Sequence, residues 1–567
     1  MIHRLACFAC GALAVVALTA RARETTFERL KAADTEAENW LMVHRTYDAT
    51  RYSPLDQINR SNASRLKLAF IVGLGGTEGS TAFPNSAMEA TPLAEDGFLY
   101  LTDGWSNVYK IDVRSGDRGE IVWKTDPGID KATVILPVNR GVALYGDMIL
   151  ELTADGRVVG MAKSNGRVLF DVSIRTNPSE TFSAAPLVVK NKLIIGASGG
   201  DWGLRGWLGA FDLDKRAMAW RWYTVPAAGE PGNETWKDDA DAWRKGGGSI
   251  WATGAYDPES NLLYWGTGNP NKANDSQGRK GDNLYTDSTV AIDADTGALK
   301  WYFQYTPNDP YDYDEVGSQS LIDVVRQGKP RKLLSHFGRN GFYYTLDAKT
   351  GRFQGATQYV QSLNWTRGLN PNTGKPLEYD PKRDVQHYAA QPARGIPSVH
   401  VCPEQRGGVN YWPPSYSPLS KLTYAGTWEG CHEITVNSDK FMGGSISNTD
   451  RVKGSLTAMD PSTVTLAGRR LSEYTNLSGA TSTGGRIVIT AFNDGTIQVL
   501  DDRTLAPLFQ LNVGTFIGAP PMVYAAGGKE YIALITGGGL PPSVSGPYRN
   551  KESFTIQSVP MLLVFSL

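Results

Sequence analysis

Residues 289–301 read TVAIDADTGALKW: an apolar strand pattern, an aspartate, a turn, and a second strand ending in tryptophan eight positions after the aspartate. The same order recurs at 208–220 (LGAFDLDKRAMAW) and, with a terminal phenylalanine, at 497–509 (IQVLDDRTLAPLF). Less complete copies bring the marker positions to seven, namely 112, 162, 212, 293, 347, 460 and 501. Each copy predicts two strands joined by an Asx-type or glycine-type reversal.

The spacing of these markers indicates a repeat of about fifty residues, interrupted by long insertions at 212–293 and 347–460. Repeats of roughly 40–50 residues with four strands each are typical of a β-propeller, whereas an array of β-sandwiches has no reason to recur in this way. The strand-like segments RLKLAFIVGL (65–74) and PMLLVFSL (560–567) are able to pair and complete one more blade. We therefore expect an all-β, eight-bladed propeller over residues 23–567, with its last blade closed by the N- and C-terminal strands.

The composition supports a globular chain. The 567 residues include 61 glycines and 31 prolines, which favours a turn-rich protein, and 10% aromatic residues, which supply a core. A hydrophobic content of 41% against 20% charged residues excludes disorder over most of the chain. The formal net charge of −1 gives no support for a nucleic-acid or anionic-membrane partner.

The N-terminus has the pattern of an export signal. Residues 1–22 contain a basic residue at Arg4, a short apolar run and a small-x-small cleavage site at 20–22. The apolar run is too short for a membrane span, and no other stretch approaches the ~18 apolar residues that a span requires. We expect residues 1–22 to be a signal peptide and the mature protein to be periplasmic.

Four cysteines are present, and Cys7 and Cys10 lie within the expected signal peptide. The remaining pair, Cys402 and Cys431, is more often a disulfide than a redox site in an oxidising compartment. The sequence has no Cys-x-x-Cys-His motif for covalent haem attachment. Any electrons released in a redox reaction are therefore expected to pass to a separate protein.

Several expected loops carry polar groups among glycines. They are GASGGDWGLRGW (196–207), GTGNP (266–270), PNDPYDYDEVG (307–317) and GRNG (338–341). Carboxylate and amide oxygens without His or Cys favour a calcium-like cation over zinc. Each loop taken alone is also compatible with an ordinary turn, because Gly, Asn, Asp and Pro are turn residues.

Taken together, these stretches resemble one enzyme family. The segments VNRGVALYG (138–146), RGWLGAFD (205–212), WGTGNP (265–270) and GDNLYTDSTVAIDADTG (281–297) are similar to the quinoprotein alcohol dehydrogenases. These are the pyrroloquinoline-quinone (PQQ) enzymes of the methanol and ethanol dehydrogenase type. The resemblance covers nearly the whole mature chain and implies an eight-bladed propeller whose tryptophans dock adjacent blades.

The resemblance also assigns roles to individual residues. Trp251 matches the indole that stacks on PQQ, and Arg339 matches the cation beside the reactive quinone carbonyl. Further PQQ-binding positions match Arg140, Ser183, Ser198, Gly199, Gly200, Ser249 and Asn410. The metal-binding positions match Asp201, Asn269 and Asp312, of which Asp312 also matches the catalytic base. Cys402 and Cys431 match a structural disulfide.

Three positions depart from the family pattern. Asp201 stands where the family usually has glutamate, so the reach to a metal is shorter by one methylene, about 1.5 Å. Val134-Ile135 replaces a vicinal disulfide and predicts an apolar lid on the second face of PQQ. Asp314 stands where lanthanide-using members carry an extra carboxylate, and one more anionic ligand favours a more highly charged ion. We expect Ca²⁺, with a lanthanide ion as the alternative.

The implied reaction oxidises an alcohol to an aldehyde or ketone by hydride transfer to metal-bound PQQ. Asp312 is expected to take the hydroxyl proton, and a neighbouring cation is expected to lower the pKa of Asp312. Electrons then pass to a separate cytochrome c. The alternative function is a non-catalytic exported propeller that serves as an assembly scaffold or binding module. The run NYWPPSY (410–416) fits either an aromatic substrate wall or core packing, so the sequence does not name the alcohol.

Overall fold

A computed structural model describes residues 23–82, 85–237, 241–326, 328–448, 452–539 and 558–567. The expected signal peptide, residues 1–22, lies outside the described residues. The described chain is built from strands, with one short helix, α1 (Phe27–Lys31), and brief 3-10 turns. Every helix in these ranges is too short or too polar to traverse a bilayer.

The strands form successive antiparallel sheets. The first sheet contains β4 (Leu93–Glu95), β5 (Phe98–Thr102), β6 (Val108–Asp112) and β7 (Glu120–Thr125), and the second contains β9 (Ala143–Tyr145), β10 (Met148–Leu152), β11 (Arg157–Ala162) and β12 (Val168–Ser173). The third sheet contains β13 (Leu187–Val189), β14 (Lys192–Gly196), β15 (Trp207–Asp212) and β16 (Ala217–Tyr223). The fourth contains β17 (Ala255–Asp257), β18 (Leu262–Gly266), β19 (Ser288–Asp293) and β20 (Leu299–Gln304). The next three contain β21 (Ser320–Arg326), β22 (Lys329–Phe337), β23 (Phe342–Asp347) and β24 (Phe353–Gln358); β26 (Ser415–Ser417), β27 (Leu422–Glu429), β30 (Lys453–Asp460) and β31 (Thr465–Ser472); and β32 (Thr481–Thr483), β33 (Ile487–Ala491), β34 (Thr496–Asp501) and β35 (Pro507–Asn512), with β1 (Tyr52–Ser53) added beside β32.

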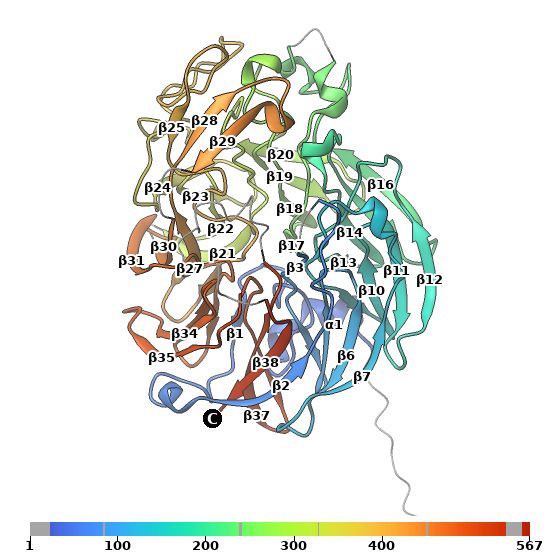
Figure 1. Cartoon of the computed structure of the whole chain (residues 1–567). Coiled ribbons are helices and arrows are strands. Elements are labelled where there is room, and N and C mark those ends of the chain that lie inside the picture. The colour runs from blue at the N-terminus through green and yellow to red at the C-terminus, as the bar shows by residue number, and fades with distance from the viewer. Residues whose placement is uncertain (1–22, 83–84, 238–240, 327, 449–451, 540–557) are drawn as a thin grey trace, which may run out of the picture.

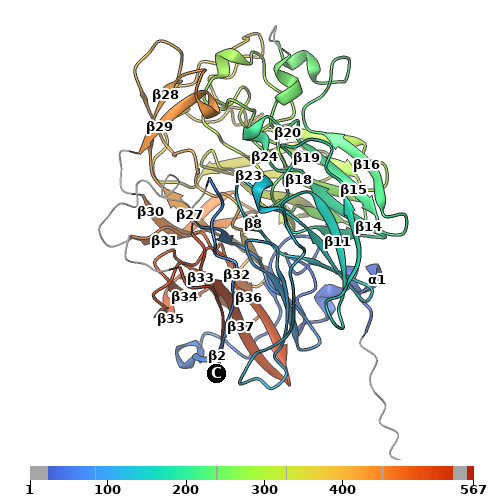
Figure 2. The same cartoon turned by 45° about the vertical axis from the view of Figure 1, so that its right-hand side comes forward.

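A further sheet joins the two ends of the chain. Its order is β2 (Lys67–Gly73), β38 (Met561–Ser566), β37 (Lys529–Thr536) and β36 (Met522–Ala526). The antiparallel β2–β38 pair joins the two terminal segments that the sequence predicted as strands. In Figure 1 the sheets follow one another around the molecule in chain order, so the blue and red ends lie side by side, and Figure 2 gives a second view of the same arrangement.

Two small sheets lie outside this series. One contains β25 (Val399–Val401), β28 (His432–Val436) and β29 (Gly444–Asn448), and it belongs to the insertion predicted between positions 347 and 460. The other is the parallel pair of β3 (Ala87–Met88) and β8 (Val138–Asn139).

The repeat seen in the sequence corresponds to one sheet. Each of the seven marker positions ends the third strand of a different sheet, for example Asp212 at the end of β15 and Asp293 at the end of β19. The Asp293 carboxylate accepts hydrogen bonds from the backbone N–H groups of Asp295 and Thr296, at 3.1 and 3.0 Å. This Asx-type reversal turns the chain into the fourth strand.

The terminal tryptophan of the repeat explains how neighbouring sheets dock. The Trp301 indole lies on Gly351, in the turn that follows β23 of the next sheet, where an added Cβ would be 2.4 Å from the ring. Its Nε1 donates to the carbonyl of Ala348 in the same turn, at 3.2 Å. Trp220 repeats this contact on Gly297, where a Cβ would lie 2.6 Å from the ring. The tryptophan of one repeat therefore requires the turn glycine of the next.

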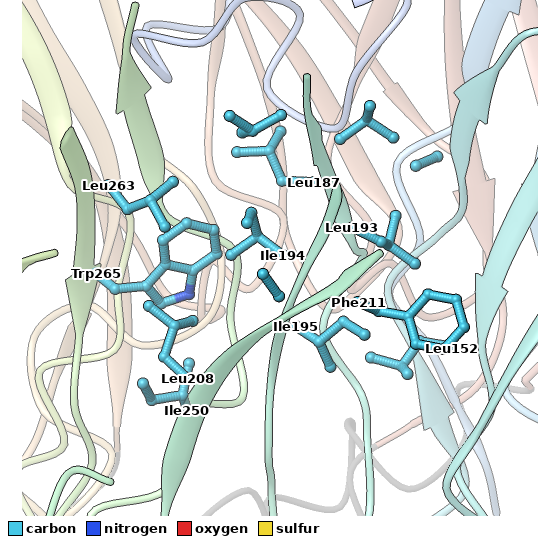
Figure 3. Packing of buried hydrophobic residues seen from close by; sticks show 14 of the residues in the cluster. Leu152, Leu187, Leu193, Ile194, Ile195, Leu208, Phe211, Ile250, Leu263 and Trp265 are labelled. Atoms are coloured by element: carbon cyan, nitrogen blue, oxygen red, sulfur yellow. The ribbon is translucent and has the colours of Figure 1, made fainter. Parts of the chain in front are cut away.

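Apolar side chains fill the space between the sheets. Figure 3 shows one such cluster, in which Leu193 and Ile195 of β14 pack with Leu208 of β15, Trp265 of β18 and Leu152 of β10. The second and third strands are buried along most of their length, whereas fourth strands such as β7 and β12 are largely exposed. The core therefore lies between faces of adjacent sheets, and the loops at their ends are free to build a site.

Candidate active site

A cavity of about 280 Å³ is lined by every residue that the sequence predicted for catalysis, PQQ binding or metal binding. The predicted residues among its lining are Arg140, Ser183, Ser198, Gly199, Gly200, Asp201, Ser249, Trp251, Asn269, Asp312, Asp314, Arg339 and Asn410. The volume is close to the lower end of pockets that hold small organic ligands, about 300–1,000 Å³.

The topology explains why residues so far apart in sequence meet. In an antiparallel sheet, the loop before the first strand and the loop after the second strand lie at the same end. Ser183 precedes β13 and Ser198 follows β14, while Trp251 precedes β17 and Asn269 follows β18. The same two kinds of loop, repeated in successive sheets, bring polar side chains to one cavity.

A cluster of oxygen donors and one arginine forms the first part of the site. The Asn269 side-chain amide donates to Asp201 Oδ1 at 3.0 Å, and its backbone N–H donates to Asp314 Oδ1 at 2.9 Å. Arg339 forms a short ion pair with Asp314 Oδ2, and its Nη2 lies 3.5 Å from Asp312 Oδ2. The other oxygen of Asp312, Oδ1, is buried and has no hydrogen-bond partner among the described residues.

Burial and crowding of carboxylates shift the protonation of this cluster. Burial raises the pKa of Asp312 well above its usual range, the Arg339 guanidinium opposes this rise, and the carboxylates of Asp201 and Asp314 add to it. Burial, together with the charge of Asp314, raises the pKa of Asp201 to about 6. The lowered pKa of Asp312 expected beside a cation is therefore wrong for the protein groups alone, because burial outweighs Arg339.

The two aspartates beside Arg339 differ in what they contact. Asp314 Oδ1 accepts from Asn269 N–H and lies 3.4 Å from Trp251 Nε1, and its Oδ2 pairs with Arg339. Both oxygens of Asp314 thus already contact protein groups, so a metal ion that binds this residue has to share an oxygen with a protein donor or replace it. Asp312 keeps one oxygen available without any such exchange.

The opposite part of the site is arranged around Arg140. Its Nη1 donates to Ser183 Oγ and to the carbonyl of Trp251, both at 2.8 Å, and its Nη2 lies 2.7 Å from Glu89 Oε2. Ser183 Oγ is in turn 3.1 Å from Ser198 Oγ. A guanidinium beside two hydroxyls is suited to hold a carboxylate of a ligand.

Two glycines that line the cavity allow the backbone to pass close to neighbouring groups. Gly199 has φ +107°, and a Cβ on it would lie 2.2 Å from the carbonyl oxygen of Ser179. A Cβ on Gly200 would lie 2.9 Å from Ser249 Oγ. Because side chains at 199 and 200 would collide with these groups, the close turn that presents Asp201 depends on glycine.

Trp251 and Tyr411 provide ring faces in the cavity. The Arg140 guanidinium lies 5.1 Å from the centre of the Trp251 ring and 5.0 Å from that of Tyr411. Asn410 contacts its own loop, because its Nδ2 donates to the carbonyl of Arg406 at 3.3 Å.

The structure corrects the apolar lid predicted at Val134-Ile135. Val134 is buried against Trp105 and Ala154, and the neighbouring side chain that lines the cavity is Leu136. The predicted disulfide is present, since Cys402 and Cys431 are bonded with their Cα atoms 4.5 Å apart. It holds the start of the loop that carries Asn410.

Sequence reasoning missed several lining residues. Those with polar or aromatic side chains are Glu89, Thr181, Trp202, Gln405, Arg406, Tyr411, Trp412 and Trp428. Tyr411 and Trp412 lie in the run that the sequence left open between a substrate wall and core packing; both are buried and also line the cavity. Glu89 has no glycine neighbour to mark it, and Arg406, although followed by Gly407 and Gly408, lies outside the four loops singled out in the sequence.

Comparison with known proteins gives a coherent result. Residues 40–353 match the family model of the PQQ glucose/ethanol/alcohol dehydrogenase β-propeller domain. Quinohemoprotein alcohol dehydrogenase ADH IIB of Pseudomonas putida is 33% identical, over 98% of this chain and 81% of that protein. The putative dehydrogenase XoxF of Paracoccus denitrificans is 31% identical, over 94% of this chain and 92% of that protein. The structure superposes on a europium-containing methanol dehydrogenase with a TM-score of 0.85 and 28% identity, covering 95% of this chain and all of the other.

Proposed function

Because the chain belongs to the family of PQQ-dependent alcohol dehydrogenases, we propose that it oxidises an alcohol to an aldehyde or ketone at the cavity around Asp312. The observation that carries this proposal is the buried Oδ1 of Asp312, which has no hydrogen-bond partner in the described part of the chain although its other oxygen lies 3.5 Å from Arg339. A carboxylate in that state is suited to accept a proton from an alcohol hydroxyl.

The residues present fit PQQ and a metal ion. When bound, PQQ supplies a quinone carbonyl carbon that accepts hydride, and a metal ion supplies Lewis-acid polarisation of that carbonyl. Arg140, Ser183 and Ser198 offer donors for ligand carboxylates, and Trp251 offers a ring face. The remaining residues proposed to contact PQQ are Gly199, Gly200, Ser249, Arg339 and Asn410.

Oxygen donors alone make up the proposed metal site. Asp201, Asn269 and Asp312 would hold the ion, which matches the hard ligands that Ca²⁺ prefers. Asp314 would join them through an oxygen that already contacts Arg339, Asn269 or Trp251. We propose Ca²⁺ as the resident ion, with a lanthanide as the alternative if Asp314 is recruited.

The protein groups around Asp312 have separable tasks. Asp312 takes the hydroxyl proton of the alcohol, and Arg339 provides a fixed positive charge beside it. Arg339 is itself held by Asp314 on one side and by the carbonyl of Gln405, which accepts from its Nε at 2.6 Å, on the other. Such fixed contacts keep the guanidinium in place without reorganisation during the reaction.

The wider setting follows the sequence expectations. We propose that residues 1–22 are a cleaved signal peptide and that residues 23–567 form one eight-bladed propeller in the periplasm, closed through β2 and β38. We propose a separate cytochrome c as the electron acceptor. An exported scaffold without catalysis has no need of an unpartnered carboxylate beside a buried arginine, so the cavity favours the enzyme.

Reconstitution tests this function. Protein purified from the periplasm is dialysed against EDTA, loaded with PQQ and either Ca²⁺ or La³⁺, and assayed for reduction of an artificial dye with a panel of primary and secondary alcohols. We expect alcohol-dependent dye reduction that requires both PQQ and one of the metals. If neither metal supports turnover with any alcohol, although PQQ binds, the protein is a binding module and not a dehydrogenase.

A further inference from the structure

Arg406 is a buried cation in the cavity that the proposed reaction does not use. It is 4% exposed and lines the same cavity as Asp312 and Arg339. Its Nη1 donates to Glu404 Oε2 at 3.0 Å, whereas its Nε and Nη2 have no hydrogen-bond partner among the described residues. Buried donors without a partner cost about 1–3 kcal/mol each, and more in a charged group. These two N–H positions therefore call for an acceptor.

Arg406 lies on a loop that contacts Arg339, the arginine beside the proposed base Asp312. The carbonyl of the preceding residue, Gln405, accepts from Arg339 Nε at 2.6 Å, and Gly408 N–H donates to the Arg339 carbonyl at 3.1 Å. The loop that carries Arg406 therefore wraps around the arginine that lies beside Asp312. Arg406 lines the cavity, whereas Glu404, which accepts from its Nη1, does not.

An aromatic wall adjoins this guanidinium. The Arg406 guanidinium carbon lies 5.2 Å from the centre of the Trp428 ring. Trp428 stacks on Trp412 with ring centres 6.0 Å apart and an interplanar angle of 13°, and both residues line the cavity. An alkyl chain fits against such a wall, while an oxygen on that chain fits Arg406.

The charges around Arg406 indicate whether a ligand oxygen bound to it would be neutral or anionic. Its charge is already matched by the fully buried Glu404. Burial, and secondly the charge of Arg406, lowers the pKa of the nearby His432 to about 3, so this histidine adds no positive charge. Asp201, Asp312 and Asp314 line the same space. A neutral hydroxyl, ether or carbonyl oxygen is therefore a better acceptor than a carboxylate.

From these observations we infer that Arg406 is a specificity-determining residue that binds a second, neutral oxygen of the alcohol substrate. The preferred substrates are diols or other oxygenated alcohols whose carbon spacer packs on Trp428 and Trp412. The inference rests on the proposed dehydrogenase function and adds to it the substrate class.

The test compares two alcohols of equal length, 1,4-butanediol and 1-pentanol, in the holoenzyme before and after Arg406→Met. A hydrogen bond to a charged group is worth about 1.5–3 kcal/mol, which corresponds to a loss of roughly 10- to 150-fold in kcat/KM. We expect this loss for 1,4-butanediol and a change below about threefold for 1-pentanol. Equal losses for both alcohols overturn the inference.

Control variants separate the inference from folding and from cofactor binding. Glu404→Gln/Arg406→Met removes the buried pair together, and it should show the same selective loss with a melting temperature close to wild type. Arg205 also pairs with a glutamate, Glu230 at 2.9 Å, and lies over an aromatic ring, but it does not line the cavity. Arg205→Met should leave the ratio of the two alcohols unchanged.

Two further outcomes would count against this assignment. If Arg406→Met raises the Kd for PQQ more than tenfold and leaves the diol preference intact, Arg406 serves the cofactor. If the selective loss appears for 4-hydroxybutanoate and not for 1,4-butanediol, the bound oxygen is anionic. Absence of wild-type activity with these two alcohols and with every other alcohol of the panel would instead contradict the dehydrogenase function itself.

Discussion

Replacement of Asp312 by asparagine isolates proton transfer from ligand binding. The amide keeps the size of the side chain and one oxygen, but it cannot accept a proton at neutral pH. Asp312 is 7% exposed, its Oδ1 has no hydrogen-bond partner in the ranges that the structure describes, and its Oδ2 lies 3.5 Å from Arg339 Nη2. The substitution therefore breaks no short hydrogen bond, so its effect on catalysis is not confused with a loss of structure.

The magnitude follows from the proposed role as general base. A positioned base contributes typically 10²–10⁴-fold to the rate, which is about 2.7–5.5 kcal/mol of transition-state stabilisation. We expect kcat for the preferred alcohol to fall by this factor in Asp312→Asn. Asp312→Asn should not lower the free energy of unfolding of the metal-free protein, because the carboxylates of Asp201 and Asp314 disfavour a negative charge at position 312.

The assay is steady-state dye reduction by protein loaded with PQQ and metal, with the loading measured by absorbance and elemental analysis. Asp287→Asn is a matched control, since Asp287 is a fully buried aspartate that does not line the cavity. It should keep kcat within about threefold of wild type. Asp312→Asn protein that is fully loaded and retains more than a tenth of the wild-type kcat would refute the assignment of the base.

Two other predictions concern stability. Burial raises the pKa of Glu530 from 4.5 to about 7 in the folded protein. Ionisation of Glu530 therefore lowers the free energy of unfolding above pH 7. It has no effect well below pH 4.5, where the group is protonated in both the folded and the unfolded state. Glu530→Gln should therefore raise the free energy of unfolding by about 3 kcal/mol at pH 8 and by little at pH 4, measured by urea unfolding; a difference independent of pH would contradict this. Gly199→Ala should destabilise the protein by about 1–3 kcal/mol and weaken metal binding, because its Cβ would lie 2.2 Å from the Ser179 carbonyl. Gly128 also has positive φ but open space around it, so Gly128→Ala should leave metal binding unchanged in calorimetry, and equal metal affinities in all three proteins would contradict the steric argument.

The repeat could be predicted because its determinants are local. The Asp293 carboxylate closes its own turn, and Trp301 docks on a glycine at a fixed place in the next repeat, so both leave a pattern in the sequence. The last sheet lacks that pattern, because it is assembled from strands at the two ends of the chain. Its prediction depended on the strand-like character of residues 65–74 and 560–567 alone.

The residues of the site were harder to predict from local sequence patterns than the repeat was. Asp201, Asn269 and Asp312 lie in segments that resemble ordinary turns, and only the family resemblance assigned them a common role. Trp428 lies one residue before the end of the buried strand β27 and resembles a core residue in sequence, although it lines the cavity. Arg406 is followed by Gly407 and Gly408, but the sequence does not show its role, because that role depends on which of its N–H groups Glu404 leaves unpaired.

The electrostatics of the site link its protonation to ligand binding. Burial and neighbouring carboxylates raise the pKa values of Asp201 and Asp312, and Arg339 is the guanidinium that opposes this rise at both residues. A cation bound among these oxygens would lower both pKa values, so metal binding is expected to release protons and to tighten as pH increases. The same charge would return Asp312 to the ionised form that a base requires. The carboxylate cluster disfavours the charged state of its own members, and we therefore expect the proposed activity to depend on a bound cation.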